Sequence, residues 1–283
     1  MKISHKRVGL ALGGGGARGI AHLGVLHIFE KYAIPVDMIA GTSMGALIAA
    51  LYARYKDARM ISRIFFEAQE LPEFKDLHLD KIARNARKES RFKHIKGSFS
   101  NYYLRHNMGF LKTAKTERFL RSLLGDMQYA DLQIPLGLVA GNINKGQGVC
   151  FREGDLLKQV QASMSLPLWM EPVSIDGAYY VDGIAHDVVP VSDLREMGAE
   201  IVIAVDVSLR NEHPRISNAV EVKYISDAMS VNRSIDLSLE KADIVIRPDT
   251  KGLMWFDFDR APKLIRSGKE AAENSIPRIN KFL

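Results

Sequence analysis

The chain has 283 residues, 47% of them hydrophobic, and a formal net charge of +6. This length buries a large core and suits one α/β domain, or one domain with an insertion. The single cysteine, Cys150, excludes an internal disulfide framework and fits a reducing compartment, and no apolar run approaches the roughly 18 residues of a membrane span.

The first sixty residues predict a βαβ unit. Residues 7–12 form a short apolar run, four glycines interrupt it, and residues 17–32 have the apolar periodicity of a helix. Residues 36–40 form a second apolar run. Because the crossover is expected to be right-handed and the strands parallel, the glycine loop and the turn after the second strand should meet at one edge of the sheet. The glycine-rich start also favours a core strand of a cytoplasmic protein over a signal peptide.

A G-x-S-x-G pattern follows the second strand, with Gly41 and Gly45 on either side of Ser43. Between a strand and a helix this pattern is typical of a nucleophile elbow, in which small neighbours permit a sharp turn. Ser43 is therefore the candidate nucleophile. Free backbone N–H groups of the glycine loop, near Gly15 and Gly16 and joined by that of Met44, would stabilise an oxyanion beside it.

The same glycines allow a second interpretation. Gly14, Gly16 and Gly19 satisfy the dinucleotide fingerprint G-x-G-x-x-G, and Asp37 follows. The acid that holds a ribose should lie near the end of the second strand, whereas Asp37 lies near its start. Arg18 would balance a phosphate in either case. A dinucleotide-binding protein thus remains the less favoured alternative.

Residues 54–121 are strongly basic, with 17 Lys and Arg against 8 Asp and Glu. The basic run at residues 84–96 precedes Phe99, Tyr102, Tyr103 and Phe110, and such a mixture suits an anionic membrane surface. No nucleic-acid motif accompanies it, so we expect no nucleic-acid partner. We predict that residues 56–121 form a basic helical cap on a single domain that comprises residues 1–283.

The remaining chain continues as alternating strands and helices. Strands are expected at residues 136–140, 149–151, 201–205 and 242–246, a hairpin at 172–181, and helices at 155–164, 220–239 and 261–274. Cys150 lies in an apolar strand and is interpreted as packing. His22, His27 and the apolar run 254–258 are likewise interpreted as packing or helix-surface residues.

A serine nucleophile needs a base, and the residues leave several candidates. Asp176 is explained by a hairpin turn, whereas Asp182 ends a strand and Asp206 follows one. A Ser-His-Asp triad would require His186 or His213, neither of which has the expected setting. No group of His, Cys, Asp and Glu has metal-ligand spacing, so no metal is expected.

Three segments, in this order, resemble the signatures of patatin-like phospholipases: residues 14–19 (GGGARG), residues 41–45 (GTSMG) and Asp182-Gly183. The likeness extends over nearly the whole chain, although Ile184 stands where the family has Gly or Ala. It implies a three-layer α/β/α fold with a mainly parallel sheet, and a serine lipid hydrolase that uses a Ser43–Asp182 dyad without histidine, metal or other cofactor.

From these observations we expect hydrolysis of the carboxylic ester of a phospholipid or lysophospholipid. The enzyme should be cytoplasmic, with peripheral contact at the inner membrane surface; the sequence leaves the oligomeric state open. A lipid-binding regulatory protein with weak turnover is the alternative outside catalysis.

Overall fold

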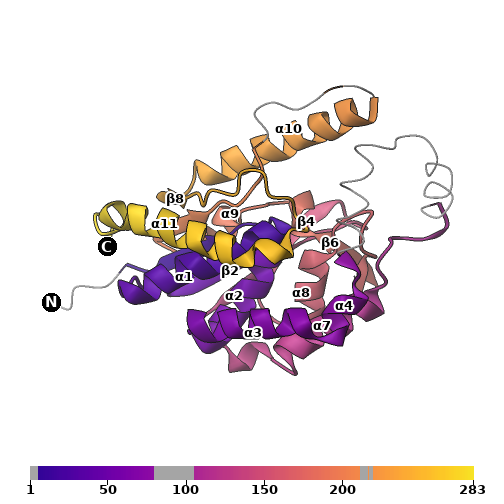
Figure 1. Cartoon of the computed structure of the whole chain (residues 1–283). Helices are drawn as coiled ribbons and strands as arrows, with labels where there is room; N and C mark the ends of the chain where they lie inside the picture. The colour runs from indigo at the N-terminus through magenta and orange to yellow at the C-terminus, as the bar shows by residue number, and fades with distance from the viewer. Residues whose placement is uncertain (1–5, 80–104, 211–215, 217–218) are drawn as a thin grey trace.

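The computed structural model describes residues 6–79, 105–210, 216 and 219–283, and these contain one sheet flanked by helices (Figure 1). Hydrogen-bonded strands follow the order β5-β6-β3-β2-β1-β7-β8, with β4 also paired to β3. The strands are β1 (Val8–Leu12), β2 (Met38–Thr42), β3 (Leu136–Asn142), β4 (Gln147–Phe151), β5 (Val173–Ile175), β6 (Ala178–Asp182), β7 (Ile201–Val205) and β8 (Ile244–Ile246). Strands β3, β2, β1, β7 and β8 are parallel, whereas β4, β5 and β6 pair antiparallel.

Successive side chains of each strand point to opposite faces of the sheet, and both faces are apolar. Leu10 and Leu12 of β1 pack with the helices on one face, whereas Ala11 packs with Leu194 and Ile235 on the other. The first face is covered by α1 (Ala21–Lys31), α2 (Met44–Tyr55), α8 (Leu156–Met164) and α11 (Ala261–Ile279), and the second by α9 (Val191–Glu196) and α10 (Ala219–Leu239). The predicted three-layer fold with a mainly parallel sheet is confirmed.

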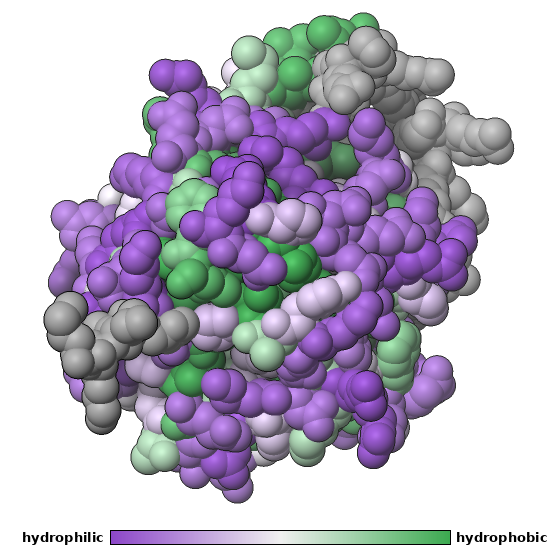
Figure 2. Space-filling model, turned by 90° about the vertical axis from the view of Figure 1, so that its left-hand side faces the viewer, coloured by the Kyte–Doolittle hydropathy of each residue, from purple (hydrophilic) through white to green (hydrophobic). Residues whose placement is uncertain are grey.

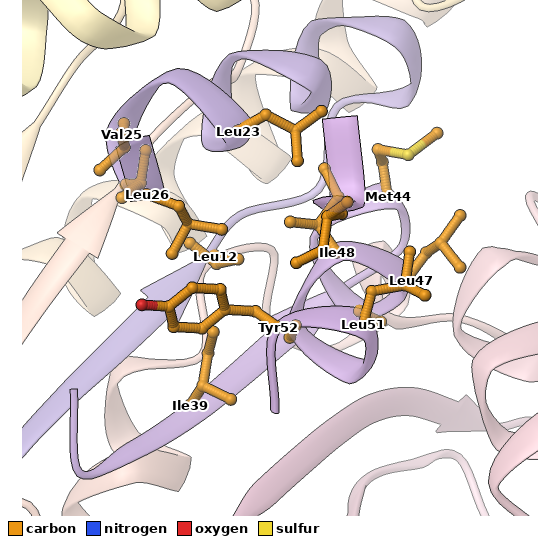
Figure 3. Close-up of a cluster of buried hydrophobic side chains, with 14 of the residues drawn as sticks. Leu12, Leu23, Val25, Leu26, Ile39, Met44, Leu47, Ile48, Leu51 and Tyr52 are labelled. Atoms are coloured by element: carbon orange, nitrogen blue, oxygen red, sulfur yellow. The ribbon is translucent and has the colours of Figure 1, made fainter. Parts of the chain in front are cut away.

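The centre of the first layer is the contact of α1 and α2 with β1 and β2 (Figure 3). Leu23 and Leu26 of α1 point toward Ile48 and Tyr52 of α2, and Leu12 and Ile39 come from the strands beneath them. The leucine and isoleucine side chains of this cluster are fully buried. Burying each contributes about 1.5–3 kcal/mol relative to exposure, so this packing fixes the strand–turn–helix segment from β2 to α2.

Two predicted helices differ from the structure. Residues 17–32 divide into a 3₁₀ turn, η1 (Gly16–Ile20), followed by α1. The prediction that the last helix ends at residue 274 is wrong, because α11 continues to Ile279 through Pro277. Ile276 and Ile279 are buried, and their packing holds the last turn despite the missing N–H of proline.

Most of the described part of residues 56–121 is helical. It contains α3 (Ala58–Glu70), α4 (Pro72–Asp76) and α7 (Thr113–Leu124), whose apolar side chains join the core below α1 and α2. The basic run 84–96, with Phe99, Tyr102 and Tyr103, lies outside the described residues, so the cap stays a prediction.

The face of the molecule seen in Figure 2 is mostly hydrophilic, with hydrophobic residues showing near its centre. Hydrophobic atoms also lie along the top of the molecule in that view, where α10 runs in Figure 1. Among the described helices, none is long and apolar enough to cross a membrane.

Strand β3 brings the ends of β2 and β6 together. Residues 138–142 of β3 pair with β4. The first two of these residues also pair with β2, and the last three also pair with β6. Because a strand has two edges, β4 occupies one edge of β3, and β2 and β6 share the other. Thr42, the last residue of β2, lies opposite Val139, and Asp182, the last residue of β6, lies opposite Ala140. Because β2 runs parallel and β6 antiparallel to β3, their carboxyl ends face each other head-on.

Candidate active site

Ser43 lies at the turn between β2 and α2, with φ 56° and ψ −123°. A non-glycine residue rarely adopts positive φ, and the conformation indicates local strain. The flanking glycines allow the close approach that this turn needs. A Cβ on Gly41 would lie 2.3 Å from the carbonyl oxygen of Gly45, and a Cβ on Gly45 would lie 2.2 Å from that of Leu12. The elbow geometry therefore depends on both glycines.

Asp182 lies at the head-on junction and is 2% exposed. Its Oδ1 accepts a hydrogen bond from the N–H of Ile184 at 2.9 Å. Burial raises the pKa of Asp182 to about 6, although this bond and the nearby Ser43 hydroxyl, which acts on the carboxylate as a donor, oppose the rise. The carboxyl group is thus a stronger base than an exposed aspartate and touches the candidate nucleophile.

The residues after Asp182 form a tight 3₁₀ turn, η3 (Gly183–Ala185). Gly183 is packed closely, since a Cβ there would lie 2.6 Å from the carbonyl oxygen of Val139. The branched side chain of Ile184 faces the cavity described below and is 38% exposed. Isoleucine at this position therefore leaves the turn undisturbed.

The glycine loop lies directly beside the elbow. A Cβ on Gly14 would lie 3.3 Å from the Cβ of Ser43. The N–H of Gly14 donates to Val188, whereas those of Gly15, Gly16 and Met44 have no hydrogen-bond partner in the part of the chain that the structure describes. Such free donors beside a serine are suited to binding a developing oxyanion.

Two further residues of the predicted loop hold it in place. The guanidinium of Arg18 donates to the carbonyl oxygens of Val207 at 3.0 Å and Leu253 at 3.4 Å. Gly19 permits contact with the elbow, because a Cβ there would lie 2.6 Å from Cγ of Met44. Arg18 therefore ties the loop to neighbouring segments of the chain.

Ser43 and Asp182 line a cavity of about 410 Å³ that also borders the glycine loop. Aromatic and aliphatic side chains make up most of the remaining wall, among them Phe65, Phe74, Phe119, Leu120, Met164, Trp169, Val231 and Trp255. A mainly apolar cavity with a few polar groups at one end suits a ligand with a long apolar part and one reactive polar group. The packing interpretation of residues 254–258 is incomplete, since Met254, Trp255 and Phe258 line this cavity.

The competing acids have other roles. Asp37 accepts from the N–H of Val8 at the opposite end of the strands, and Asp176 has φ 49° in the β5–β6 turn. The carboxylate of Asp206 accepts from Arg247 at 3.2 Å and from the N–H of Ser208 at 3.0 Å. None of the three lines the cavity.

The histidine and cysteine candidates that the structure describes, His186 and Cys150, do not line the cavity. The ring of His186 packs over Gly148, where a Cβ would lie 1.8 Å from the ring, and His213 lies outside the described residues. Cys150 packs against Gly137, and burial raises the pKa of its thiol to about 12. Within the described ranges, no cluster of His, Cys, Asp and Glu could hold a metal ion.

The sequence interpretation missed two buried polar residues at this site. Nε2 of His22 lies 2.7 Å from the carbonyl oxygen of Gly13, and burial lowers the pKa of His22 to about 4, so the neutral ring donates to the glycine loop. Ser163 of α8 accepts from the N–H of Ser43 at 2.9 Å. A polar residue within an apolar helix is the one signal that could have pointed to His22; Ser163 carries no comparable signal.

Comparison with known proteins agrees with this architecture. A family model described as patatin-like phospholipase matches residues 10–195. Lysophospholipase NTE1 of Debaryomyces hansenii is 26% identical over 303 residues, covering 98% of this chain and 18% of that protein. Lysophospholipase nte1 of Neurospora crassa is 32% identical over 215 residues, covering 76% and 13%. The chain therefore spans less than a fifth of either relative.

Among solved structures, human GIVD cytosolic phospholipase A2 superposes with a TM-score of 0.55 at 11% identity, covering 97% of this chain and 59% of that one. This likeness and the sheet topology show a shared α/β fold with a mainly parallel sheet between helical layers. The family match is more specific: the chain belongs to the patatin-like phospholipase family. The resemblance inferred from residues 14–19, 41–45 and 182–183 is thereby confirmed.

Proposed function

We propose that this chain is a serine lipid acyl hydrolase that cleaves the carboxylic ester of a phospholipid or lysophospholipid. The observation that carries the proposal is that Ser43 and the buried carboxylate of Asp182 lie together at the polar end of an apolar cavity, with the Ser43 hydroxyl close enough to lower the carboxyl pKa. The family match and the lysophospholipase names of the two fungal relatives support the substrate class.

Acylation begins when Ser43 Oγ attacks the ester carbonyl carbon and passes its proton to Asp182. The carbonyl π electrons move onto oxygen, and the N–H groups of Gly15, Gly16 and Met44 stabilise the resulting oxyanion, each contributing about 3–4 kcal/mol. When the oxyanion collapses, the bond between carbon and the alcohol oxygen breaks. Asp182 gives its proton to the departing alcohol, and the acyl group stays on Ser43.

Deacylation repeats these transfers with water. Asp182 accepts a proton from water, whose oxygen attacks the acyl carbon, and collapse of the second oxyanion breaks the bond to Ser43 Oγ. The proton held by Asp182 returns to Ser43, and the fatty acid leaves. A pKa near 6 allows Asp182 to be ionised at neutral pH while remaining basic enough to serve both steps without histidine.

The test is calcium-free fatty-acid release from phospholipid and lysophospholipid, measured by mass spectrometry. We expect wild type to release fatty acid, and Ser43→Ala and Asp182→Asn each to lose at least about 10³-fold in kcat. Asp206→Asn is the matched control, because its carboxylate is paired with Arg247 away from the cavity. If Asp206→Asn lost activity and Asp182→Asn retained it, the general base would be Asp206 and not Asp182. Lipid binding by wild type without release would support a regulatory protein.

We also propose that the chain acts in the cytoplasm in peripheral contact with an anionic lipid surface at the inner membrane. Leu168, between cavity residues Pro167 and Trp169, is 63% exposed, and the cavity residues Ile184 and Met254 are each 38% exposed. Exposed apolar side chains around a cavity that suits acyl chains favour entry of lipid from an interface.

Sedimentation with anionic vesicles tests this contact. Leu168→Asp should weaken vesicle binding by about 5-fold or more, since a charge replaces an apolar side chain at the rim. Leu283→Asp changes another exposed leucine at the chain end and should bind as wild type does. Removing the charges of Arg87, Lys88, Arg91 and Lys93 tests the basic run separately. Unchanged vesicle binding in all these variants would refute the contact.

A further inference from the structure

The head-on meeting of β2 and β6 leaves an interruption in the ladder of β3. Val139 pairs with the last residue of β2, and Ala140 pairs with the last residue of β6. Between these two pairs, the backbone of β3 has no neighbouring strand to complete its hydrogen bonds on this edge. Buried backbone groups at such a point need partners from elsewhere. The interruption lies at the place from which Ser43 and Asp182 extend.

Ser163, near the end of α8, fills this interruption. Its Oγ donates to the carbonyl oxygen of Val139 at 2.6 Å and accepts from the N–H of Ser43 at 2.9 Å. The side chain is fully buried, so water does not compete for either bond. One hydroxyl therefore connects the central strand to the backbone of the candidate nucleophile.

The position of that backbone matters because Ser43 is strained. Its φ of 56° and ψ of −123° fall in a region that L-residues rarely adopt, and surrounding contacts must hold it there. The hydrogen bond from the Ser43 N–H fixes the peptide plane between Thr42 and Ser43. That plane sets the direction in which the Ser43 side chain leaves the elbow.

We propose that Ser163 is a positioning residue of the reaction: it holds the Thr42–Ser43 peptide so that Ser43 Oγ stays within reach of Asp182. This inference rests on the proposed function. Ser163 does not line the cavity, so its loss should slow the chemical steps without weakening lipid binding.

The first experiment compares Ser163→Ala with wild type in lysophospholipid hydrolysis. We expect kcat to fall by about 10- to 100-fold while KM changes less than about 2-fold, because misplacement of a reacting atom affects rate rather than affinity. Ser62→Ala is the matched control. Ser62 is also buried, donates to the carbonyl oxygen of Ala58 at 2.7 Å and contacts His27 at 3.1 Å, but it lies on α3 outside the cavity.

A second pair of variants covers the case in which Ser163→Ala fails to fold. Ser163→Thr and Ser163→Val have nearly the same shape and differ in the hydroxyl. Ser163→Thr should retain at least about 10-fold more kcat than Ser163→Val, because it alone can bridge Val139 and Ser43.

The rate at which an alkyl fluorophosphonate modifies Ser43 gives a readout that needs no lipid turnover. It should fall in Ser163→Ala and Ser163→Val but not in Ser62→Ala. If wild type hydrolyses no lipid yet reacts with the probe, the proposed function fails while the positioning role can still be judged. Equal kcat losses in Ser163→Ala and Ser62→Ala, a loss confined to KM, or equal rates for the Thr and Val variants would overturn the inference.

Discussion

At the residue scale, the protonation of Asp182 should set the pH dependence of activity. The carboxyl group must be ionised to accept the proton of Ser43, and burial raises its pKa to about 6. We therefore expect kcat/KM to rise with pH through about 6 and then to level off, whereas an exposed aspartate would give a limb near pH 4. The check is a pH–rate profile of wild type and of His186→Asn, which should share the limb. A limb below about pH 5, or one lost in His186→Asn, would contradict this assignment.

The same pKa has a consequence for stability. The folded carboxyl group binds its proton more tightly than the unfolded one, so stability falls as pH rises from the usual value of 3.8 through about 6. Above this window the native state holds a buried charge that asparagine lacks. Asp182→Asn should thus exceed wild type in unfolding free energy by about 1–3 kcal/mol near pH 8, with no gain near pH 3. Urea denaturation at both pH values measures the difference, and an equal gain at both would contradict the prediction.

At the element scale, residues 187–189 connect three parts of the site. Thr42 of the elbow donates to the carbonyl oxygen of Asp187 at 2.8 Å, and Gly14 of the glycine loop donates to that of Val188 at 2.9 Å. The hydroxyl of Ser238 of α10 lies within hydrogen-bond distance of Asp187 Oδ2, at 2.9 Å, and of the carbonyl oxygen of Val189, at 2.7 Å. This segment holds the elbow, the glycine loop and α10 in one arrangement.

Ser238→Ala tests the attachment of α10. Burial raises the pKa of Asp187 to about 6, and the Ser238 hydroxyl stabilises its ionised form. Loss of the hydroxyl should lower the unfolding free energy by about 1–2 kcal/mol near pH 8 and by less near pH 5, where the carboxyl group is mostly protonated. Denaturant unfolding at both pH values is the measurement. Ser230→Ala, on the exposed side of α10, is the control; the same loss in both variants would show that the Asp187 contact is not responsible.

At the scale of the whole molecule, the cavity exists because distant segments converge. Phe65 comes from α3, Phe119 from α7, Met164 from α8, Val231 from α10, and Trp255 from the chain before α11. No single element contributes a complete wall. The size of the cavity, and with it the length of acyl chain that the proposed activity would accept, is therefore a property of the assembled layers.

Met164→Trp should shorten the preferred acyl chain. The larger ring would occupy part of the cavity of about 410 Å³, so kcat/KM should fall at least about 10-fold more for long-chain than for short-chain esters. A chain-length series of esters measures the change. Met60→Trp, on the exposed side of α3, adds the same ring outside the cavity and should leave the series unchanged. Parallel loss across all chain lengths in Met164→Trp would mean general damage.

Short-range signals in the sequence were enough to predict the local elements of this protein. The strand at Ile201–Val205 and the elbow around Ser43 follow from short-range information: apolar runs give strands, and small residues on both sides of Ser43 permit a strained turn. The parallel βαβ start follows from chirality and short connections, which are also local. The family and the three-layer fold were predicted from the resemblance of residues 14–19, 41–45 and 182–183 to the patatin-like signatures.

Apart from that resemblance the residues leave the base open, and the assembled fold brings Asp182 to Ser43 and builds the cavity around them. Asp182 and Asp206 both lie at the ends of apolar strands, and in the sequence only the resemblance of Asp182-Gly183 to a family signature separates them. Strand β6 pairs with β3 just beyond the point where β2 ends, and this pairing brings Asp182 to Ser43. Strand β7 pairs with β1 instead, and Asp206 at its end contacts Arg247. The bridge by Ser163 and the cavity wall at Trp255 arise in the same way. Strand register and helix packing join residues far apart in the chain, and those contacts come from the assembled sheet and its layers.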